Sequence, residues 1–158
     1  MKDWRRDDWV SDMVEALEGK PFFRWFDSGD LMHIKLAQKV LLVCEQTPNT
    51  RHWIPTQTWD IKTYQPTLHA LDALHNVVLR ASAKDVNHPV SVWRNSSVVL
   101  SDPDKASSLG VTLCSAYSNS GKCGPCRACY DKEVKTIGYV AHGQSMARHI
   151  KLTQVDHE

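Results

Sequence analysis

The sequence has no long apolar run and no large excess of charge of either sign. Its longest purely apolar stretch covers residues 40–44, far short of the roughly 20 residues that cross a bilayer as a helix. The N-terminus mixes both charges and is followed by no continuous apolar core, so it does not resemble a secretory signal. Lys and Arg number 19 against 18 Asp and Glu, which gives no general electrostatic case for nucleic acid or membrane. We therefore expect an intracellular protein without membrane association.

Cysteine is also scarce, with five in 158 residues, too few for a small domain built on disulfides. Intracellular thiols stay reduced, so these cysteines call for another explanation. The chain shows no internal repeat, low-complexity tract or long flexible linker. We predict a single domain over residues 1–158, with a helix in 1–20, a βα core over 21–113, a tetracysteine metal-binding segment over 114–142 and a tail over 143–158.

Hydrophobic periodicity alternates between strand-like and helix-like segments. Helical spacing over residues 9–17 and 34–44 is ended by Gly19-Lys20-Pro21 and by Thr47-Pro48. Strand-like segments cover residues 22–26, 51–54, 77–81, 97–100, 110–113 and 136–140, and a further helical stretch surrounds residues 68–74. This alternation predicts an α/β fold, as a partial barrel or an open, mostly parallel sheet of βα units. The chain is too short for eight such units, which take about 250 residues.

Polar side chains follow the first three strand-like segments. Because ligands of parallel α/β sheets bind at the carboxyl ends of the strands, these side chains form a candidate ligand-binding face: Asp27, Ser28, Asp30, Thr56, Arg80 and Ser82. Gly29 would let the backbone turn tightly there. The structural alternative is that Asp30 only caps the helix after it. No catalytic residue is assigned.

Four cysteines lie close together, at Cys114, Cys123, Cys126 and Cys129. Metal coordination stabilises thiolates, and four sulfurs complete a tetrahedral shell, so this cluster predicts one tetrathiolate metal site. Three cysteines spaced C-x2-C-x2-C plus a distant fourth favour a [4Fe–4S] cluster, and Zn²⁺ is the alternative. Cys44 lies on the apolar face of its predicted helix, where we expect a small core residue.

An ordered set of short motifs accompanies this cluster: Arg24-Trp25-Phe26-Asp27-Ser28-Gly29-Asp30, Trp53-Ile54-Pro55-Thr56, Leu79-Arg80-Ala81-Ser82-Ala83, the segment from Gly121 to Cys129, and then Tyr139 and His142. In that order they resemble the phage and plasmid "gene product eighty-eight" family. The resemblance implies a partial α/β barrel with distant similarity to radical-type iron–sulfur enzymes, and a phage or mobile-element protein working in a bacterial cytoplasm.

The sequence departs from the family pattern at two places. No cysteine precedes Cys44, whereas the resemblance implies a Cys-rich segment ahead of Ser28-Gly29-Asp30, so we interpret the chain as N-terminally shortened and without intact radical chemistry. Gln57 replaces the arginine of the family's Pro-Thr-Arg, which removes a cation that could hold an anionic substrate.

Three functions remain open from the sequence. The first is a metalloprotein built on the tetracysteine site. The second is a protein–protein interaction module, such as a phage-encoded inhibitor of a host defence complex. The third is nucleic-acid binding through a basic C-terminal segment, which would use Lys122, Arg127, Lys132, Lys135, Arg148 and Lys151.

Overall fold

The computed structural model describes residues 3–27 and 29–142. The chain groups into two compact units, residues 1–81 (unit 1) and residues 82–158 (unit 2). A single domain over the whole chain therefore stays a prediction, and the predicted tail, residues 143–158, lies outside the described residues. Within the described part, no helix is long and apolar enough to cross a membrane.

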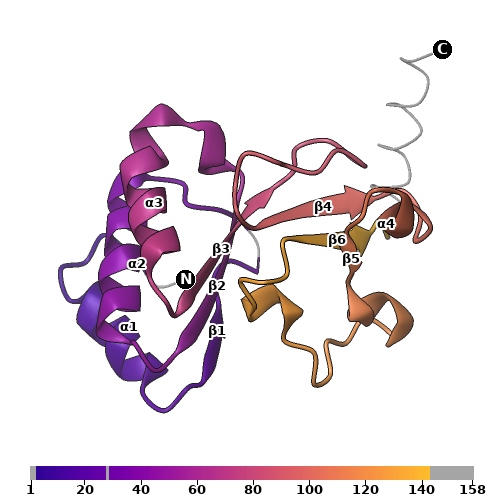
Figure 1. The fold of residues 1–158 in the computed structure, drawn as a ribbon. Coiled ribbons are helices and arrows are strands. Elements are labelled where there is room, and N and C mark those ends of the chain that lie inside the picture. The colour runs from indigo at the N-terminus through magenta and orange to yellow at the C-terminus, as the bar shows by residue number, and fades with distance from the viewer. Residues whose placement is uncertain (1–2, 28, 143–158) are drawn as a thin grey trace. The chain divides into compact units, whose positions relative to one another are not determined.

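Unit 1 pairs parallel strands with helices. Its strands lie in the order β1-β2-β3, with bounds β1 Phe22–Arg24, β2 Arg51–Thr56 and β3 Val77–Ser82. Its helices are α1 Trp9–Leu17, α2 Ile34–Gln46 and α3 Gln65–Ala73, with 3-10 turns at Thr58–Asp60 and Lys62–Tyr64. Figure 1 shows α1, α2 and α3 on the same side of these strands. Parallel strands joined by helices confirm the predicted α/β class.

Local sequence explains where the first two helices end. Gly19 has a φ of +69°, which favours glycine and turns the chain after α1. Pro48 lacks the N–H that would continue α2 past Gln46. Both helices therefore end where the glycine and proline pattern predicts.

Alternate residues of β2 and β3 face opposite sides of the sheet. His52 contacts Thr47 at the end of α2, so His52 and Ile54 face the helices. Trp53 and Pro55 face the other way, and the register places Arg80 beside Pro55. The helix face thus carries most of the apolar core, and the opposite face carries Arg80.

Aromatic side chains fill the core beneath the helices. The Trp25 side chain is 1% exposed, and its Nε1 donates a hydrogen bond to Nδ1 of His52 at 3.2 Å. The Trp25 ring packs at 6.3 Å from the ring of Trp9 and edge-on at 5.0 Å from Phe23. This arrangement explains why the aromatic strand-like segment ends up buried.

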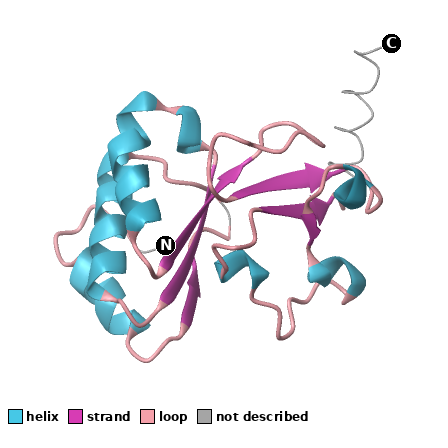
Figure 2. Cartoon of the chain, viewed as in Figure 1, coloured by secondary structure: helices cyan, strands magenta, loops and turns pink. Residues whose placement is uncertain are grey.

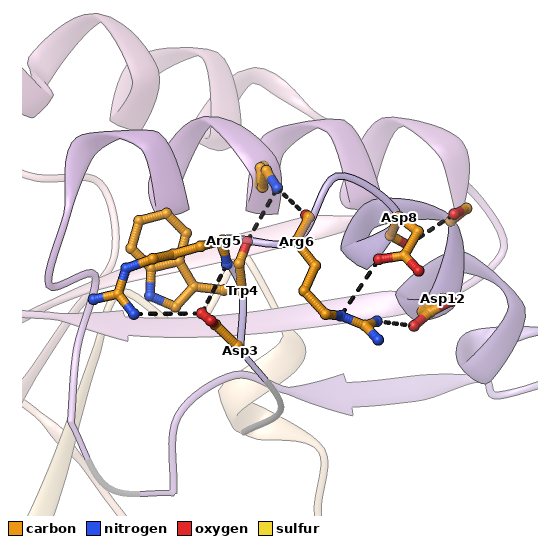
Figure 3. Close-up of polar contacts among 8 residues, drawn as sticks. Asp3, Trp4, Arg5, Arg6, Asp8 and Asp12 are labelled. Carbon is orange, nitrogen blue, oxygen red and sulfur yellow. Dashed lines mark hydrogen bonds and ion pairs between the residues drawn. The ribbon is translucent and has the colours of Figure 1, made fainter.

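Polar contacts attach the charged N-terminal segment to α1 and α2 (Figure 3). The Arg6 guanidinium pairs with Asp8 at 3.3 Å and also with Asp12. Nζ of Lys39 donates to the backbone oxygens of Trp4 and Arg6, at 3.0 and 2.5 Å. Exposed ion pairs contribute little stability individually. The Arg6 ion pairs and the Lys39 hydrogen bonds therefore position this segment together.

Unit 2 contains a second set of parallel strands (Figure 2). They lie in the order β4-β6-β5, with bounds β4 Ser96–Leu100, β5 Thr112–Leu113 and β6 Thr136–Val140. The short helix α4, Lys105–Ser108, connects β4 to β5, and 3-10 turns at Ser115–Ser118 and Ala128–Tyr130 follow β5. Val98, Leu100 and Ala106 form the buried cluster of this unit. All four clustered cysteines lie in the connection from β5 to β6.

Candidate functional site

The Asp30 carboxylate joins the exits of β1 and β2. Its Oδ1 accepts a hydrogen bond from the backbone N–H of Leu31, and its Oδ2 accepts one from Gln57, both at 2.6 Å. This contact brings the residues after β1 and β2 together at Asp30. The N-cap alternative is wrong, because His33 is the N-cap of α2 and its Nδ1 accepts from the N–H of Lys35 at 3.1 Å.

The neighbouring candidate side chains of unit 1 also have partners within the protein. Thr56 is buried, and its Oγ1 lies 2.8 Å from Oγ1 of Thr58. The Asp27 side chain is 92% exposed and pairs with Arg24 at 3.6 Å. Arg24 also lies over the ring of Trp53, 4.5 Å from its centroid, a cation–π contact that the sequence motifs do not reveal. Ser28 lies outside the described residues.

The last two candidates on this face belong to β3. Arg80 is completely buried and lies within the strand rather than in the loop after it. Ser82, which falls in unit 2, accepts a hydrogen bond from the hydroxyl of Ser97 at 3.3 Å. Most of the described candidate side chains therefore have partners within the protein, and the ligand-binding face stays a prediction.

Unit 1 has a cleft away from these strand ends. Its volume is about 510 Å³, and it lies between the end of α1 and the turn from α2 to β2, with Glu15, Glu18, Gln46 and Asn49 in its lining. Among the described residues, none of the side chains predicted from the strand ends lines it.

Three of the four clustered cysteines are attached to one end of the β5–β6 pair. The N–H of Cys114 donates to the backbone oxygen of Gly138 at 2.8 Å. Sγ of Cys129 lies 3.4 Å from the hydroxyl of Tyr139, the next residue of β6. Cys126 hydrogen-bonds with the side chain of Ser115, the residue after Cys114. Cysteines that are separated in sequence are thus held by residues that lie close together, namely positions 114–115 and 138–139.

The fourth cysteine is held through a turn. The N–H of Cys126 donates to the backbone oxygen of Cys123 at 3.2 Å, and Cys123 is exposed. Gly124, inside this turn, has a φ of +55°, and a Cβ there would lie 3.2 Å from Nδ2 of Asn119. The positive φ favours glycine at this position, and a larger residue would also require the Asn119 side chain to shift slightly.

The cysteines are chemically suited to bind a metal, but their side chains are not arranged as a metal site. All five cysteines are free. The hydrogen bond from Ser115, with smaller contributions from the N–H of Ala128 and the charge of Arg127, lowers the pKa of the Cys126 thiol, which favours the thiolate that metals bind. However, within residues 3–27 and 29–142 no group of three or more His, Cys, Asp or Glu side chains is arranged to hold a metal ion. For these cysteines to bind a metal, the loops between positions 115 and 135 would have to move.

Cys44 differs from the other four cysteines. It is fully buried on α2, and burial raises the pKa of its thiol. The prediction that Cys44 is a small core residue is confirmed.

Gly138 offers a direct test of how the β5–β6 pair holds Cys114. A Cβ at this position would lie 2.5 Å from Cδ1 of the buried Leu100 and 3.1 Å from Cγ2 of Val111. We expect Gly138→Ala to lower the free energy of unfolding by about 1–3 kcal/mol through overpacking, measured by urea denaturation, and to speed maleimide labelling of Cys114. The double variant with Leu100→Ala should cost less than the sum of the single changes; additive losses would contradict the contact.

The fold and the cysteines together define an α/β protein with parallel strands and a cysteine-rich connection ahead of its last strand. The model of the Gene product 88 family matches residues 1–132. The chain belongs to this family, as its motifs predict, and family membership indicates a phage-type protein. The match includes all four clustered cysteines but ends before Tyr139. The comparisons with curated proteins and with solved structures gave no match.

Proposed function

We propose that this chain is a metalloprotein in which Cys114, Cys123, Cys126 and Cys129 hold one metal centre, a [4Fe–4S] cluster or Zn²⁺. The observation that carries the proposal is the common anchoring of Cys114, Cys126 and Cys129 at positions 114–115 and 138–139. Cys123 follows through its turn with Cys126. Small loop movements would therefore gather four sulfurs, the complete shell that a tetrathiolate centre needs.

The role we assign to the centre is structural, without radical chemistry. The connection from β5 to β6 has little buried apolar surface of its own, since residues 115–135 are all exposed or half-buried and form no strand. A bound metal would order it by converting binding free energy into folding free energy. Lys122 and Arg127 would offset part of the thiolate charge.

Metal analysis of anaerobically purified protein tests the proposal. We expect either about four iron and four sulfide per chain with a brown chromophore, or about one Zn²⁺ per chain without colour. Cys126→Ser should lose the metal and become more sensitive to proteolysis between residues 114 and 135, because a lost ligand frees the metal.

Cys44→Ala is the matched control, because it removes a thiol outside the segment and should keep the metal. Protein that is folded but free of metal after anaerobic purification and after reconstitution with iron and sulfide or with Zn²⁺ would overturn the proposal. Cys126→Ser with wild-type metal content would also contradict it.

A second candidate is the interaction module that inhibits a host complex. It is favoured by the large exposed apolar side chains of unit 2, Val92 at 76% and Tyr117 at 54% exposure, together with the internal engagement of the strand-end groups described above. Tyr117 lies in the cysteine-rich connection, so a metal centre and a partner surface would be compatible.

Nucleic-acid binding receives less support. Nη1 of Arg127 donates to the backbone oxygens of Gly124 and Cys126, so this cation holds the cysteine loop. Arg148 and Lys151 lie outside the described residues.

A further inference from the structure

The turn between Cys123 and Cys126 brings the backbones of two cysteines close together. The hydrogen bond from the N–H of Cys126 to the oxygen of Cys123 is 3.2 Å long and closes a four-residue turn. Such turns bring their end Cα atoms within about 7 Å, and disulfides span Cα separations of about 4.4–6.8 Å. Gly124 and Pro125 fix this turn, since Gly124 has a φ of +55° that other residues rarely adopt.

The remaining cysteines of the segment are held at different positions. Cys114 is bonded to Gly138 through its backbone, and the sulfur of Cys129 contacts the hydroxyl of Tyr139. Cys123 is exposed, whereas Cys114, Cys126 and Cys129 are half-buried. The first thiol that a solution reagent meets is thus Cys123, and the nearest thiol along the chain is Cys126.

The charges around the turn select the kind of reagent. Lys122 and Arg127 flank the two cysteines in sequence and are both exposed, and Nη1 of Arg127 lies against the turn, 2.9 Å from the oxygen of Gly124 and 2.7 Å from that of Cys126. Two cations beside an exposed thiol attract negatively charged molecules.

We propose that Cys123 and Cys126 form a dithiol that undergoes reversible thiol–disulfide exchange with small anionic disulfides. This activity uses two thiols of the proposed metal centre but does not rest on a metal being present. It also limits that centre, because a cysteine in a disulfide cannot be a thiolate ligand.

The exchange proceeds in two balanced steps. The Cys123 thiolate attacks one sulfur of the reagent, whose S–S bond breaks, and a mixed disulfide forms as the first thiolate leaves. The Cys126 thiolate then attacks the Cys123 sulfur, and the Cys123–Cys126 bond forms as the second thiolate leaves. The two cysteines lose two electrons and two protons, and the reagent is reduced to two thiols that take up the protons.

The test uses the full chain, stripped of metal under reducing conditions and then exposed to glutathione disulfide. After alkylation and peptide mass mapping, we expect the Cys123–Cys126 disulfide to exceed any other pairing about tenfold, with Cys114 and Cys129 alkylated. Cys126 and Cys129 are spaced equally closely in sequence, but the Cys123–Cys126 pair is closed by a turn, and the sulfur of Cys129 lies against the hydroxyl of Tyr139. Cys126→Ser should stop at a mixed disulfide of glutathione on Cys123. Cys44→Ala, which removes a thiol outside the segment, should leave the exchange unchanged.

A second experiment tests whether the positive charge of Arg127 favours anionic disulfides over uncharged ones. Arg127→Gln should slow the reaction with glutathione disulfide several-fold, and slow the reaction with uncharged hydroxyethyl disulfide less. Random pairing among the four cysteines, or alkylation of all four after oxidation, would overturn the proposal. Its failure is distinguishable from that of the metal centre, because metal content is measured on protein as purified and exchange on protein from which metal has been removed.

Discussion

Replacing Asn76 by aspartate is expected to be among the most damaging single changes in unit 1. Nδ2 of Asn76 donates to three backbone oxygens at the end of α2, those of Cys44, Thr47 and Thr50, at 3.0, 3.0 and 3.2 Å. Asn76 is 5% exposed. Pro48 has no N–H to offer the oxygen of Cys44, four residues before it, so the Asn76 amide supplies the donor that the chain itself cannot.

Alanine would remove these donors, and aspartate would place a charged acceptor against the same oxygens. We expect Asn76→Ala to lower the free energy of unfolding by about 2–3 kcal/mol and Asn76→Asp by about 3–5 kcal/mol. Urea denaturation at pH 7, followed by the fluorescence of the buried Trp9 and Trp25, measures both.

Asn49→Asp is the matched control for this comparison. Asn49 is exposed in the same turn, so the change should alter stability by less than about 0.5 kcal/mol. Equal losses for Asn76→Asp and Asn76→Ala would contradict the close contact of the Asn76 side chain with the three carbonyl oxygens, because only aspartate adds a negative charge beside them.

The elements of unit 1 were predictable because their signals are local. Helix ends at Gly19 and Pro48, apolar spacing along α2 and the short aromatic run before Asp27 each depend on residues close in sequence. The segment 136–140 was likewise predicted and forms β6. The same local signals placed Cys44 in the core.

Contacts between distant residues were not predictable in this way. Asp30 is of a residue type that often caps helices. Its carboxylate instead accepts a hydrogen bond from the N–H of Gln57, which follows the next strand, and His33 caps the helix. The sequence shows four cysteines close together, yet the contact of Cys129 with Tyr139 depends on the pairing of β5 with β6. Local patterns contain no information on that pairing.

The second large effect is acid destabilisation through His52. This side chain is completely buried. Its Nδ1 accepts from Nε1 of Trp25 at 3.2 Å, and its Nε2 lies 2.9 Å from Oγ1 of Thr47, which itself donates to the oxygen of Val43. Nε2 therefore carries the single ring proton, and a second proton on Nδ1 would break the bond from Trp25.

Burial lowers the pKa of His52 to about 4, and a hydrogen bond with the backbone of Thr47 offsets part of that shift. An unfolded histidine has a pKa near 6.5, so the unfolded chain takes up a proton first and the folded state loses stability as the pH falls. The stabilisation is complete above about pH 6.5 and decreases by about 2 kcal/mol at pH 5 and about 3 kcal/mol at pH 4.

Urea denaturation of two variants across this pH range isolates the histidine from the carboxylates, which also titrate there. His52→Gln retains a donor toward Thr47 but cannot take up the proton, so it should be less stable at pH 7 and show a clearly shallower decline between pH 7 and pH 4.5. His75→Gln removes an exposed histidine and should follow the wild-type decline. Parallel curves for wild type and His52→Gln would mean that His52 is not held neutral in the fold, and that the bond from Trp25 does not govern its protonation.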